Sequence, residues 1–415
     1  MPPRRVVADE LELGAGLEVL VAAALEGVAP GERLEVQVAS PGIAHELAAW
    51  TRLAGHELVG QTASDGRRAA QRVTIRRGSA RRVLGDEAPP RAEPLGADGR
   101  LGLDEVRAAT GPAPAHAPPA GGLVPLGAIA EPGGPRYHWA LSERDRLWAR
   151  ELALLAEIAA REQWDATEDI PWEAAAGLPD DVERAVSQVM TYIAQNEYAA
   201  FYVPARFLPQ VNPQYAEVLL WLASHVHDEA RHLEVFTKRA VAGGVRSHAL
   251  ASTELSLHTL LEEHDFSNAA LLLNVLGEGT FLDLLRFVER HAPDAATATA
   301  ARLAHRDERR HVHFGIAHVR RRIAGDPDAA AALVAAAEAR AAKLTSLSGI
   351  SPLLSEALTL MSARSRQPAE LSEAAAEVQA LLVTMHDNRQ RRLRAAGFDP
   401  ATARYLSELH TPNLM

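Results

Sequence analysis

Two segments of this chain repeat one five-residue pattern, and no other feature of the sequence constrains the fold as strongly. The pattern D-E-x-R-H occurs at Asp228–His232 and again at Asp307–His311, each time in a long stretch whose apolar residues recur every three or four positions. Residues three apart lie on one face of a helix, so the glutamate and the histidine of each segment point the same way. Each segment therefore offers one carboxylate and one imidazole to a single point beside its helix.

Each repeat is preceded by a glutamate with strongly apolar neighbours. Glu197 lies 32 residues before Glu229, and Glu278 lies 30 residues before Glu308. A helix–turn–helix of this length brings the midpoints of its two helices opposite each other in an antiparallel pair. The spacing predicts two helix pairs, each of which supplies one glutamate and one Glu-x-x-His motif.

Together these side chains have the composition of a dinuclear metal site. Four carboxylates and two histidines inside a helical bundle are the ligand set of di-iron and di-manganese carboxylate centres. Four carboxylates carry a charge of about −4, which balances two divalent cations, whereas burial of four unpaired like charges would be prohibitive. The predicted metal ligands, which are also the predicted catalytic residues, are Glu197, Glu229, His232, Glu278, Glu308 and His311.

The other residues of the two motifs fit supporting roles. A metal-bound imidazole normally donates its second N–H to a carboxylate or a carbonyl. We expect Asp228 and Asp307 to accept these hydrogen bonds across the bundle, and Arg231 and Arg310 to neutralise the two aspartates. Ordinary surface salt bridges are the alternative interpretation for these four residues.

Two glycines flank one of the predicted ligands. Gly277 and Gly279 enclose Glu278 within a predicted helix, where each glycine costs about 1 kcal/mol relative to alanine. Their missing side chains either leave room for oxygen or substrate beside the carboxylate or allow close helix packing. The sequence leaves both explanations open.

The amino-acid composition excludes several other kinds of site. The chain has 415 residues and no cysteine, which excludes disulfides, thiolate zinc sites, iron–sulfur clusters, haem–thiolate ligation and cysteine nucleophiles. Its net charge of −11 disfavours nucleic-acid binding.

No apolar stretch reaches the ~20 residues of a membrane span. The N-terminal MPPRRVVADELEL turns acidic where a signal peptide is apolar, so we expect a cytoplasmic protein.

The chain is predicted to be mainly α, with a ferritin-like helical bundle preceded by a small two-layer α/β sandwich. Residues 1–81 show strand and helix signals in the order β-α-β-α-β-β. Residues 82–137 hold ten of the 25 prolines and are predicted to be an extended, mobile linker. Residues 138–325 form the predicted bundle, and residues 326–415 are predicted to pack on it. The expected helices span 142–163, 180–206, 213–241, 253–290, 295–324, 328–346, 352–363, 369–397 and 400–408.

The first domain resembles a known family. The stretch APGERLEVQVASPGIAHELAAWTRLAGHELVG is similar to the sulfur-carrier (sulfurtransferase) family. That family carries sulfur on a cysteine followed by proline just before its first helix, whereas this chain has Glu18 and Val19 at about that place. This chain therefore has no residue that could carry a persulfide. We expect the first domain to be a structural module or a docking site for a partner protein.

The helical region resembles the ferritin-like di-iron carboxylate superfamily. The doubled D-E-x-R-H and the GEGTF segment are most similar to the hydroxylase subunits of bacterial multicomponent monooxygenases. The resemblance implies oxygen activation at a carboxylate-bridged metal pair, with two iron ions, or manganese and iron, as the cofactor and O2 as the co-substrate. It also implies one half-site of Glu197, Glu229 and His232 and a second of Glu278, Glu308 and His311.

A further histidine is a feature of the arylamine N-oxygenases, in which it lies four residues before a ligand glutamate. Here His225 lies four residues before Glu229, and His305 lies three residues before Glu308. In that interpretation either histidine faces the metals. In the alternative interpretation, each histidine hydrogen-bonds to a metal ligand without contacting the metal, or simply packs against its neighbours.

The predicted function is that of an O2-activating non-heme di-iron oxygenase or oxidase, with hydroxylation of a small organic substrate as the first choice. An N-oxygenase on the same site and an iron-handling ferroxidase are the alternatives. No flavin, nicotinamide or iron–sulfur motif is present, so electrons are expected from an external ferredoxin or reductase. We expect a small-molecule substrate, and neither nucleic acid nor membrane as a partner; a homodimer stays open.

Overall fold

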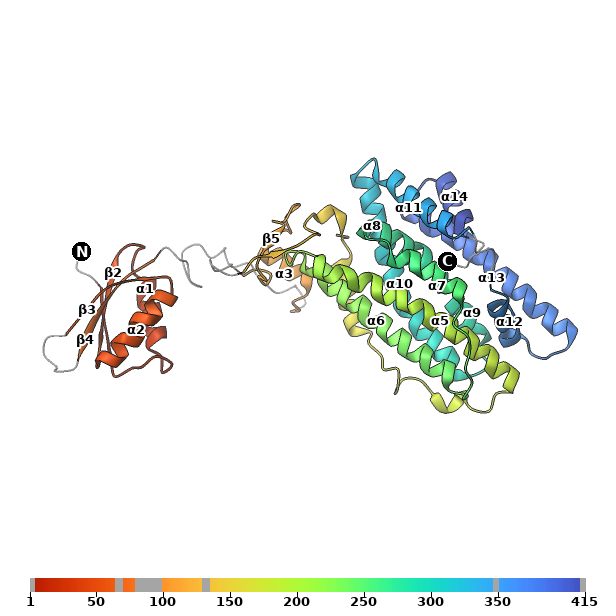
Figure 1. Ribbon diagram of the computed structural model, residues 1–415, viewed down its shortest axis with the longest axis horizontal. Helices are drawn as coiled ribbons and strands as arrows, with labels where there is room; N and C mark the ends of the chain where they lie inside the picture. The colour runs from red at the N-terminus through yellow and green to blue at the C-terminus, as the bar shows by residue number, and fades with distance from the viewer. Residues whose placement is uncertain (1–3, 64–69, 79–98, 129–134, 346–350, 411–415) are drawn as a thin grey trace. The chain divides into compact units, whose positions relative to one another are not determined.

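The computed structural model describes residues 4–63, 70–78, 99–128, 135–345 and 351–410 (Figure 1). They divide into two compact units, one formed by described residues before 79 and one by described residues from 99 onward. The first is a small α/β sandwich and the second is almost entirely helical. The predicted fold class, mainly α with a sandwich ahead of a helical bundle, is thereby confirmed. None of the described helices has the length and apolar character needed to cross a membrane.

The N-terminal unit is a four-stranded sheet with two helices. Its elements follow the predicted order: β1 (Arg4–Asp9), α1 (Leu17–Glu26), β2 (Arg33–Val38), α2 (Pro41–Leu53), β3 (Glu57–Ala63) and β4 (Gln71–Arg76). The strands lie in the order β1-β2-β4-β3, with β1 parallel to β2 and with β4 antiparallel to β2 and β3. The sequence SDG at positions 64–66 also predicts a turn between the last two strands, and this turn lies outside the described residues.

Local sequence explains these elements. In β2 the buried side chains are Leu34, Val36 and Val38, and they alternate with more exposed ones, as expected for a strand with one covered face. Helix α2 begins after Ser40, whose Oγ accepts the N–H of Ile43 at 3.3 Å. A serine cap followed by proline at the first helical position is a favourable helix start.

The structure differs from the predicted linker. Within the predicted range, residues 82–98 and 129–134 lie outside the described residues, but residues 99–128 belong to the helical unit. This segment contains α3 (Leu103–Thr110) and the short strand β5 (Ala120–Gly121), which pairs with β6 (Tyr137–His138).

Specific contacts hold this segment on the bundle. Arg107 donates to the Gln214 carbonyl at 3.0 Å and forms an ion pair with Glu217. The Ala117 N–H donates to the Ser142 carbonyl at 2.8 Å. Proline fixes φ before folding and so lowers the entropy lost on ordering. A proline-rich composition therefore does not by itself keep the segment mobile.

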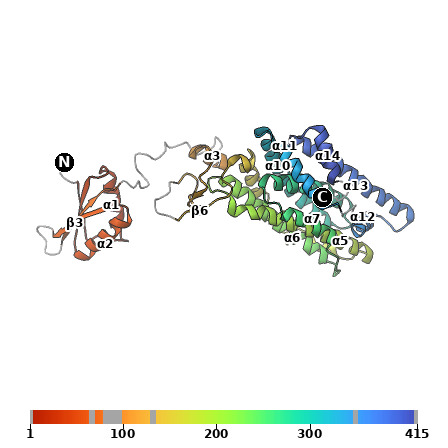
Figure 2. The same cartoon turned by 45° about the horizontal axis from the view of Figure 1, so that its top comes forward.

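Two helix pairs form the bundle. The first pairs α5 (Asp180–Phe207) with α6 (Ala216–Val241). The second pairs α10 (Ala295–Gly325) with a continuous helical segment made of α8 (Phe266–Ala269), the π-helix η4 (Ala270–Glu278) and α9 (Gly279–His291). α5, α6 and α10 lie side by side in both views (Figure 1; Figure 2), and α9 packs on α10 (Figure 1). This is the arrangement that the two helix–turn–helix spacings predict.

Further helices surround this bundle. They are η1 (Arg144–Arg146), α4 (Leu152–Arg161), η2 (Trp172–Ala175), η3 (Leu208–Gln210), α7 (Ala251–Leu261), α11 (Ala329–Lys343), α12 (Pro352–Ser362), α13 (Pro368–Ala395) and α14 (Pro400–His410). α12 packs on α5, and α13 packs on α9. The predicted helix at 142–163 is thus a 3-10 turn followed by the shorter α4.

The predicted helix at 253–290 is interrupted. α7 ends at Leu261, and a new helix starts at Phe266 because the Asp265 carboxylate accepts the N–H groups of Ser267 and Asn268 at 2.9 and 3.0 Å. Aspartate is among the preferred N-cap residues. The interruption lets α7 turn away from η4 and pack on α5.

His318 is a buried histidine of α10 outside the repeated motifs. It has no exposed surface, its Nε2 lies 3.0 Å from the Ser267 hydroxyl, and the Phe314 ring stacks on it. Burial lowers the pKa of His318 from 6.5 to about 4. The folded protein therefore keeps this imidazole neutral at a pH at which the unfolded chain protonates it.

We expect the His318→Gln variant to lose less stability on acidification than the wild type. Because the unfolded chain takes up the proton first, His318 costs stability as the pH falls from its unfolded pKa toward its folded pKa, by about 2 kcal/mol at pH 5. Glutamine can keep a hydrogen bond to Ser267 without titrating. Urea unfolding of both metal-free proteins at about pH 7.5 and about pH 5 measures the difference; equal losses would contradict the prediction.

Candidate metal centre

The predicted ligands come together in the core of the bundle. They are Glu197 on α5, Glu229 and His232 on α6, Glu278 at the end of η4, and Glu308 and His311 on α10. None of the six is more than 4% exposed. Two motifs and two glutamates far apart in the chain thus form one buried cluster.

The ligand atoms form two groups that share one carboxylate. In each group, one ligand atom from every residue lies within 4.8 Å of the others. The first group is Glu197, Glu229, His232 and Glu308, and the second is His225, Glu229, Glu278 and His311. Glu229 therefore faces both positions at which a metal ion would lie.

The first group contains the predicted half-site of Glu197, Glu229 and His232, and the second contains Glu278 and His311, whereas Glu308 falls in the first group. The two motifs also reach across the bundle. His311 Nδ1 lies 2.8 Å from Glu229 Oε1, and His232 Nδ1 lies 3.5 Å from Glu308 Oε1. Glu308 Oε2 also lies 3.3 Å from His311 Nδ1. α6 and α10 face each other, so the side chains of one motif interleave with those of the other. Glu229 and Glu308 both have the geometry of bridging carboxylates.

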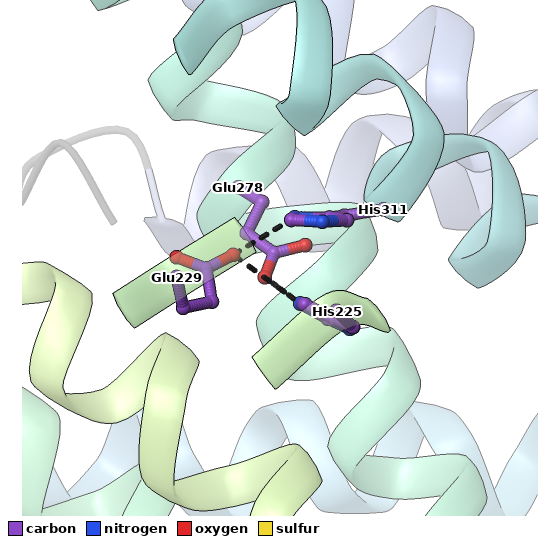
Figure 3. Close-up of side chains that lie close together, drawn as sticks. All are labelled: His225, Glu229, Glu278 and His311. Carbon is purple, nitrogen blue, oxygen red and sulfur yellow. Dashed lines mark hydrogen bonds and ion pairs between the residues drawn. The ribbon is translucent and has the colours of Figure 1, made fainter. Parts of the chain in front are cut away.

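His225 lies inside the cluster. Its Nε2 is 3.1 Å from Glu278 Oε1 and 3.3 Å from Glu229 Oε1, and Figure 3 shows it pointing at these carboxylates beside His311. The signal for this position is the spacing of four residues between His225 and Glu229, which places both on one face of α6. The structure thus places His225 among the possible ligands rather than one layer further out.

His305 lies outside both groups. It is partly exposed, and burial lowers its pKa with help from the positive charges of Arg286 and Arg309. Its spacing of three from Glu308 therefore does not bring it into either group.

Several polar atoms of the cluster form no hydrogen bond of acceptable geometry among the described residues, although most of them lie within ion-pair distance of one another, at 2.8–3.5 Å. They are Glu197 Oε1, both carboxylate oxygens of Glu229, Glu308 Oε2, and the Nδ1 atoms of His232 and His311. Buried polar atoms without partners are rare, and each needs an explanation. Metal ions bound within the two groups would satisfy these atoms. Carboxylate and imidazole together suit iron and manganese, so the residues present fit a pair of such ions.

The charges of the cluster lead to the same conclusion. Burial and the nearby Glu229 carboxylate raise the pKa of Glu197 well above its ordinary value, and burial also raises the pKa of Glu278. Burial acts in the same direction on Glu229, but His232 and His311 outweigh it and hold the pKa of Glu229 well below its ordinary value. Burial thus disfavours the ionised forms of Glu197 and Glu278, and added positive charge beside them would favour those forms.

The two aspartates of the motifs support the histidines of the opposite motif. His232 Nε2 lies 3.3 Å from Asp307 Oδ2, and His311 Nε2 lies 3.4 Å from Asp228 Oδ2. A hydrogen bond at Nε2 leaves Nδ1 free to face the cluster. This is the arrangement across the bundle that the sequence predicts, and it fixes the ring orientation of both histidines.

Two buried arginines neutralise these aspartates. Arg231 Nη2 lies 2.5 Å from Asp228 and 2.9 Å from Asp307, and Arg310 Nη2 lies 2.9 Å from Asp228 and 2.7 Å from Asp307. The arginine side chains are only 5% and 6% exposed. These four residues form a buried network rather than surface salt bridges, so the alternative interpretation is wrong.

Other residues of the network were not found from the sequence. The Trp164 indole N–H donates to Asp307 at 2.6 Å, and Gln163 accepts from Arg231. Both lie just beyond α4, and nothing in the local sequence links them to the motifs. Asn274 Nδ2 donates to Glu278 Oε2 at 2.7 Å. Its spacing of four residues from Glu278 was an available signal.

The two glycines that flank Glu278 have different roles, and each matches one of the two explanations. A Cβ atom on Gly279 would lie 2.7 Å from Nε of Arg392, so this glycine allows close packing against α13. A Cβ atom on Gly277 would meet only the Leu272 carbonyl, at an ordinary 3.4 Å, and Gly277 lines a pocket beside the cluster. Gly277 is thus the one whose missing side chain leaves space at the site.

Comparison with known proteins finds likeness only among solved structures. No protein-family model matches the chain, and a search of curated proteins finds no match. A tyrosine-to-phenylalanine variant of an R2-like ligand-binding oxidase with aerobically reconstituted Mn/Fe cofactor is 17% identical, with a TM-score of 0.45, over 60% of this chain and 94% of that chain. An R2-like ligand-binding oxidase with aerobically reconstituted Mn/Fe cofactor (long soak) is 17% identical, with a TM-score of 0.42, over 64% and 91%. At this level the likeness assigns neither function nor ligand.

Proposed function

We propose that this chain is an O2-activating non-heme di-metal oxidoreductase that acts on a small organic substrate. The observation that carries the proposal is the convergence of four carboxylates and three histidines, all buried, around two neighbouring positions with unpartnered ligand atoms facing inward. Two iron ions, or one manganese and one iron, suit these ligands. The four carboxylates would balance the charge of two divalent ions.

The protein would hold the pair of ions through distinct roles of its residues. Glu229 and Glu308 lie between the two positions and could each contact both ions, while Glu197 and His232 would hold one ion and His225, Glu278 and His311 the other. When bound, the ions would supply electrons and open coordination positions for O2. Asp228 and Asp307 orient the imidazoles and keep their Nε2 protons in place.

A pocket beside the cluster supports an organic substrate over iron storage. Its lining includes the ligands Glu197, Glu278 and Glu308, and its other walls are mostly apolar: Ala199, Ala200, Leu257, Leu260, Leu273 and Phe281. An apolar wall suits a carbon skeleton and keeps water from the reacting atoms. Passage of iron ions would instead require polar or acidic walls.

Hydroxylation is the reaction that we propose first, in line with the resemblance of the motifs. N-oxygenation is the second candidate, and the observation that favours it is the position of His225 Nε2 within 3.3 Å of Glu229 and 3.1 Å of Glu278. We also propose that an external donor supplies the electrons, that the protein is cytoplasmic, and that the N-terminal unit docks a partner protein.

We expect anaerobic titration with ferrous ion to load two irons per chain. The site is closed by protein ligands and its pocket is apolar, so addition of O2 without reductant should produce a single turnover. Stopped flow should show this turnover as a transient visible band, and the O2 uptake should be limited. Excess ferrous ion should not prolong the uptake. Continued O2 uptake that scales with added iron and ends in ferric mineral would contradict the proposal and favour a ferroxidase.

A further inference from the structure

A buried arginine outside the repeated motifs lines the pocket beside the metal ligands. Arg340 lies on α11 and is 4% exposed. The pocket that it lines also touches Glu197, Glu278 and Glu308. One pocket thus connects the candidate metal centre with a positive charge.

The guanidinium is held in place but has no counter-ion among the residues that the structure describes. Its Nε donates to the Thr259 hydroxyl and its Nη2 to the Ser256 hydroxyl, both at 3.0 Å. Its Nη1 has no hydrogen-bond partner among the described residues. Burial lowers the pKa of Arg340 to about 10, which leaves the group charged at neutral pH. Two hydroxyl groups on α7 therefore orient a cation that they do not neutralise.

Another buried arginine of the bundle, Arg239, differs from Arg340 because it has counter-ions. Arg239 forms ion pairs with Glu183 at 2.8 Å and with Asp294 at 2.9 Å. A buried charge without a partner is costly. Among the described residues no carboxylate forms an ion pair with Arg340, and its Nη1 is available to a ligand in the pocket that it lines.

We propose that Arg340 binds the carboxylate of a small amphiphilic acid, whose apolar body fills the pocket toward Glu197, Glu278 and Glu308. The inference names the substrate class of the proposed oxidoreductase and rests on that function for the statement that this ligand is a substrate. The closed part of the pocket has a volume of only about 30 Å³, so an acid that binds there displaces the apolar side chains that line it.

The polar atoms of the pocket favour a carboxylate over a larger anion. Apart from Arg340 and the three ligand glutamates, the only polar side chain of the lining is that of Asn196, which donates to its own helix at Tyr192. A phosphate group has more acceptor oxygens and would need further donors. One free guanidinium nitrogen between apolar walls matches a single carboxylate at the end of a carbon skeleton.

We test this with the full chain, both metal-free and loaded with redox-inactive zinc. Calorimetry with hexanoate, octanoate, decanoate and benzoate, each beside the corresponding alcohol, measures binding without turnover. We expect at least one acid to bind more tightly than its alcohol, and the Arg340→Met variant to bind that acid roughly tenfold to a hundredfold more weakly. The Arg340→Lys variant, which keeps the charge, should recover part of this loss.

Arg389 provides the matched control. It is 1% exposed, donates to Thr280 at 3.1 Å and to the Ser407 carbonyl at 3.3 Å, and does not line the pocket. The Arg389→Met variant should bind the acid as the wild type does, which separates loss of the anchor from loss of a buried arginine in general.

Three results would overturn the inference. In the first, every acid binds as tightly as its alcohol. In the second, the wild type and Arg340→Met bind the acid equally tightly. In the third, the acid binds only to the zinc-loaded protein, and the Arg340→Met substitution does not change that affinity. Each can occur while the chain still loads two irons and consumes O2, in which case the proposed function stands. Conversely, binding that depends on Arg340 in a chain that does not turn over O2 would contradict the proposed function alone.

Discussion

The Glu229→Gln variant is expected to lose tight binding at both metal positions. Glu229 is the residue shared by the two groups, and both of its carboxylate oxygens lack a hydrogen-bond partner. An amide removes the charge and one of the two oxygens that can bridge. Because loss of a supporting contact alone typically costs about 10–100-fold in metal affinity, loss of this ligand should reduce the metal content from two ions per chain to less than one. Elemental analysis after desalting measures the result.

Two further variants make this result specific. Glu197 belongs to one group only, so Glu197→Gln should weaken one position and spare the other. Glu183 is a buried glutamate of the same bundle that pairs with Arg239 and belongs to neither group. Glu183→Gln should keep both ions. Retention of two ions by Glu229→Gln would show that the cluster is not the metal site.

The sequence is sufficient to predict the bundle and six members of the cluster because the necessary information is local. The spacing of three residues within each D-E-x-R-H motif sets the helix face, and the spacing of about 30 residues to Glu197 and Glu278 sets the height along each helix pair. Both follow from helix geometry alone. For the same reason the alternating residues of β2 suffice to predict a half-buried strand.

What the sequence could not provide depends on how distant elements meet. The predicted half-sites follow each helix pair and so do not include the contacts between the pairs, in which the facing of α6 and α10 makes His232 meet Glu308 and His311 meet Glu229. Trp164 approaches Asp307 from a segment that no local pattern connects to the motif. Composition likewise made residues 99–128 look like a linker, although contacts with the bundle order them.

Removal of the metal ions is expected to destabilise the helical unit strongly. Ions that bind only the folded state at a thousand times their Kd stabilise it by about 4 kcal/mol, and each kcal/mol shifts the Tm of a domain of this size by roughly 2–4 °C. We therefore expect chelation to lower the Tm of the helical unit by roughly 8–16 °C. Circular dichroism at a helix-sensitive wavelength follows this transition.

The N-terminal unit is the internal control, because the metal ligands all lie in the other unit. Its transition in differential scanning calorimetry should not move when the ions are removed. Identical unfolding of the helical unit with and without bound ions would contradict a structural contribution of the metals to this site.

The effect of Glu197→Gln on thermal stability should differ in sign between the metal-free and the metal-loaded protein. In the metal-free protein Glu197 is 2% exposed, has an unpartnered Oε1, and lies in one group with the carboxylates of Glu229 and Glu308. Replacing it with an amide removes a buried carboxyl group from a repulsive cluster, so the metal-free variant should unfold at the same temperature as the metal-free wild type or above it. With ions present the variant loses a ligand and should unfold below the wild type. A variant that is less stable than the wild type in both states by the same amount would show that Glu197 acts in packing and not in balancing the charge of bound metal.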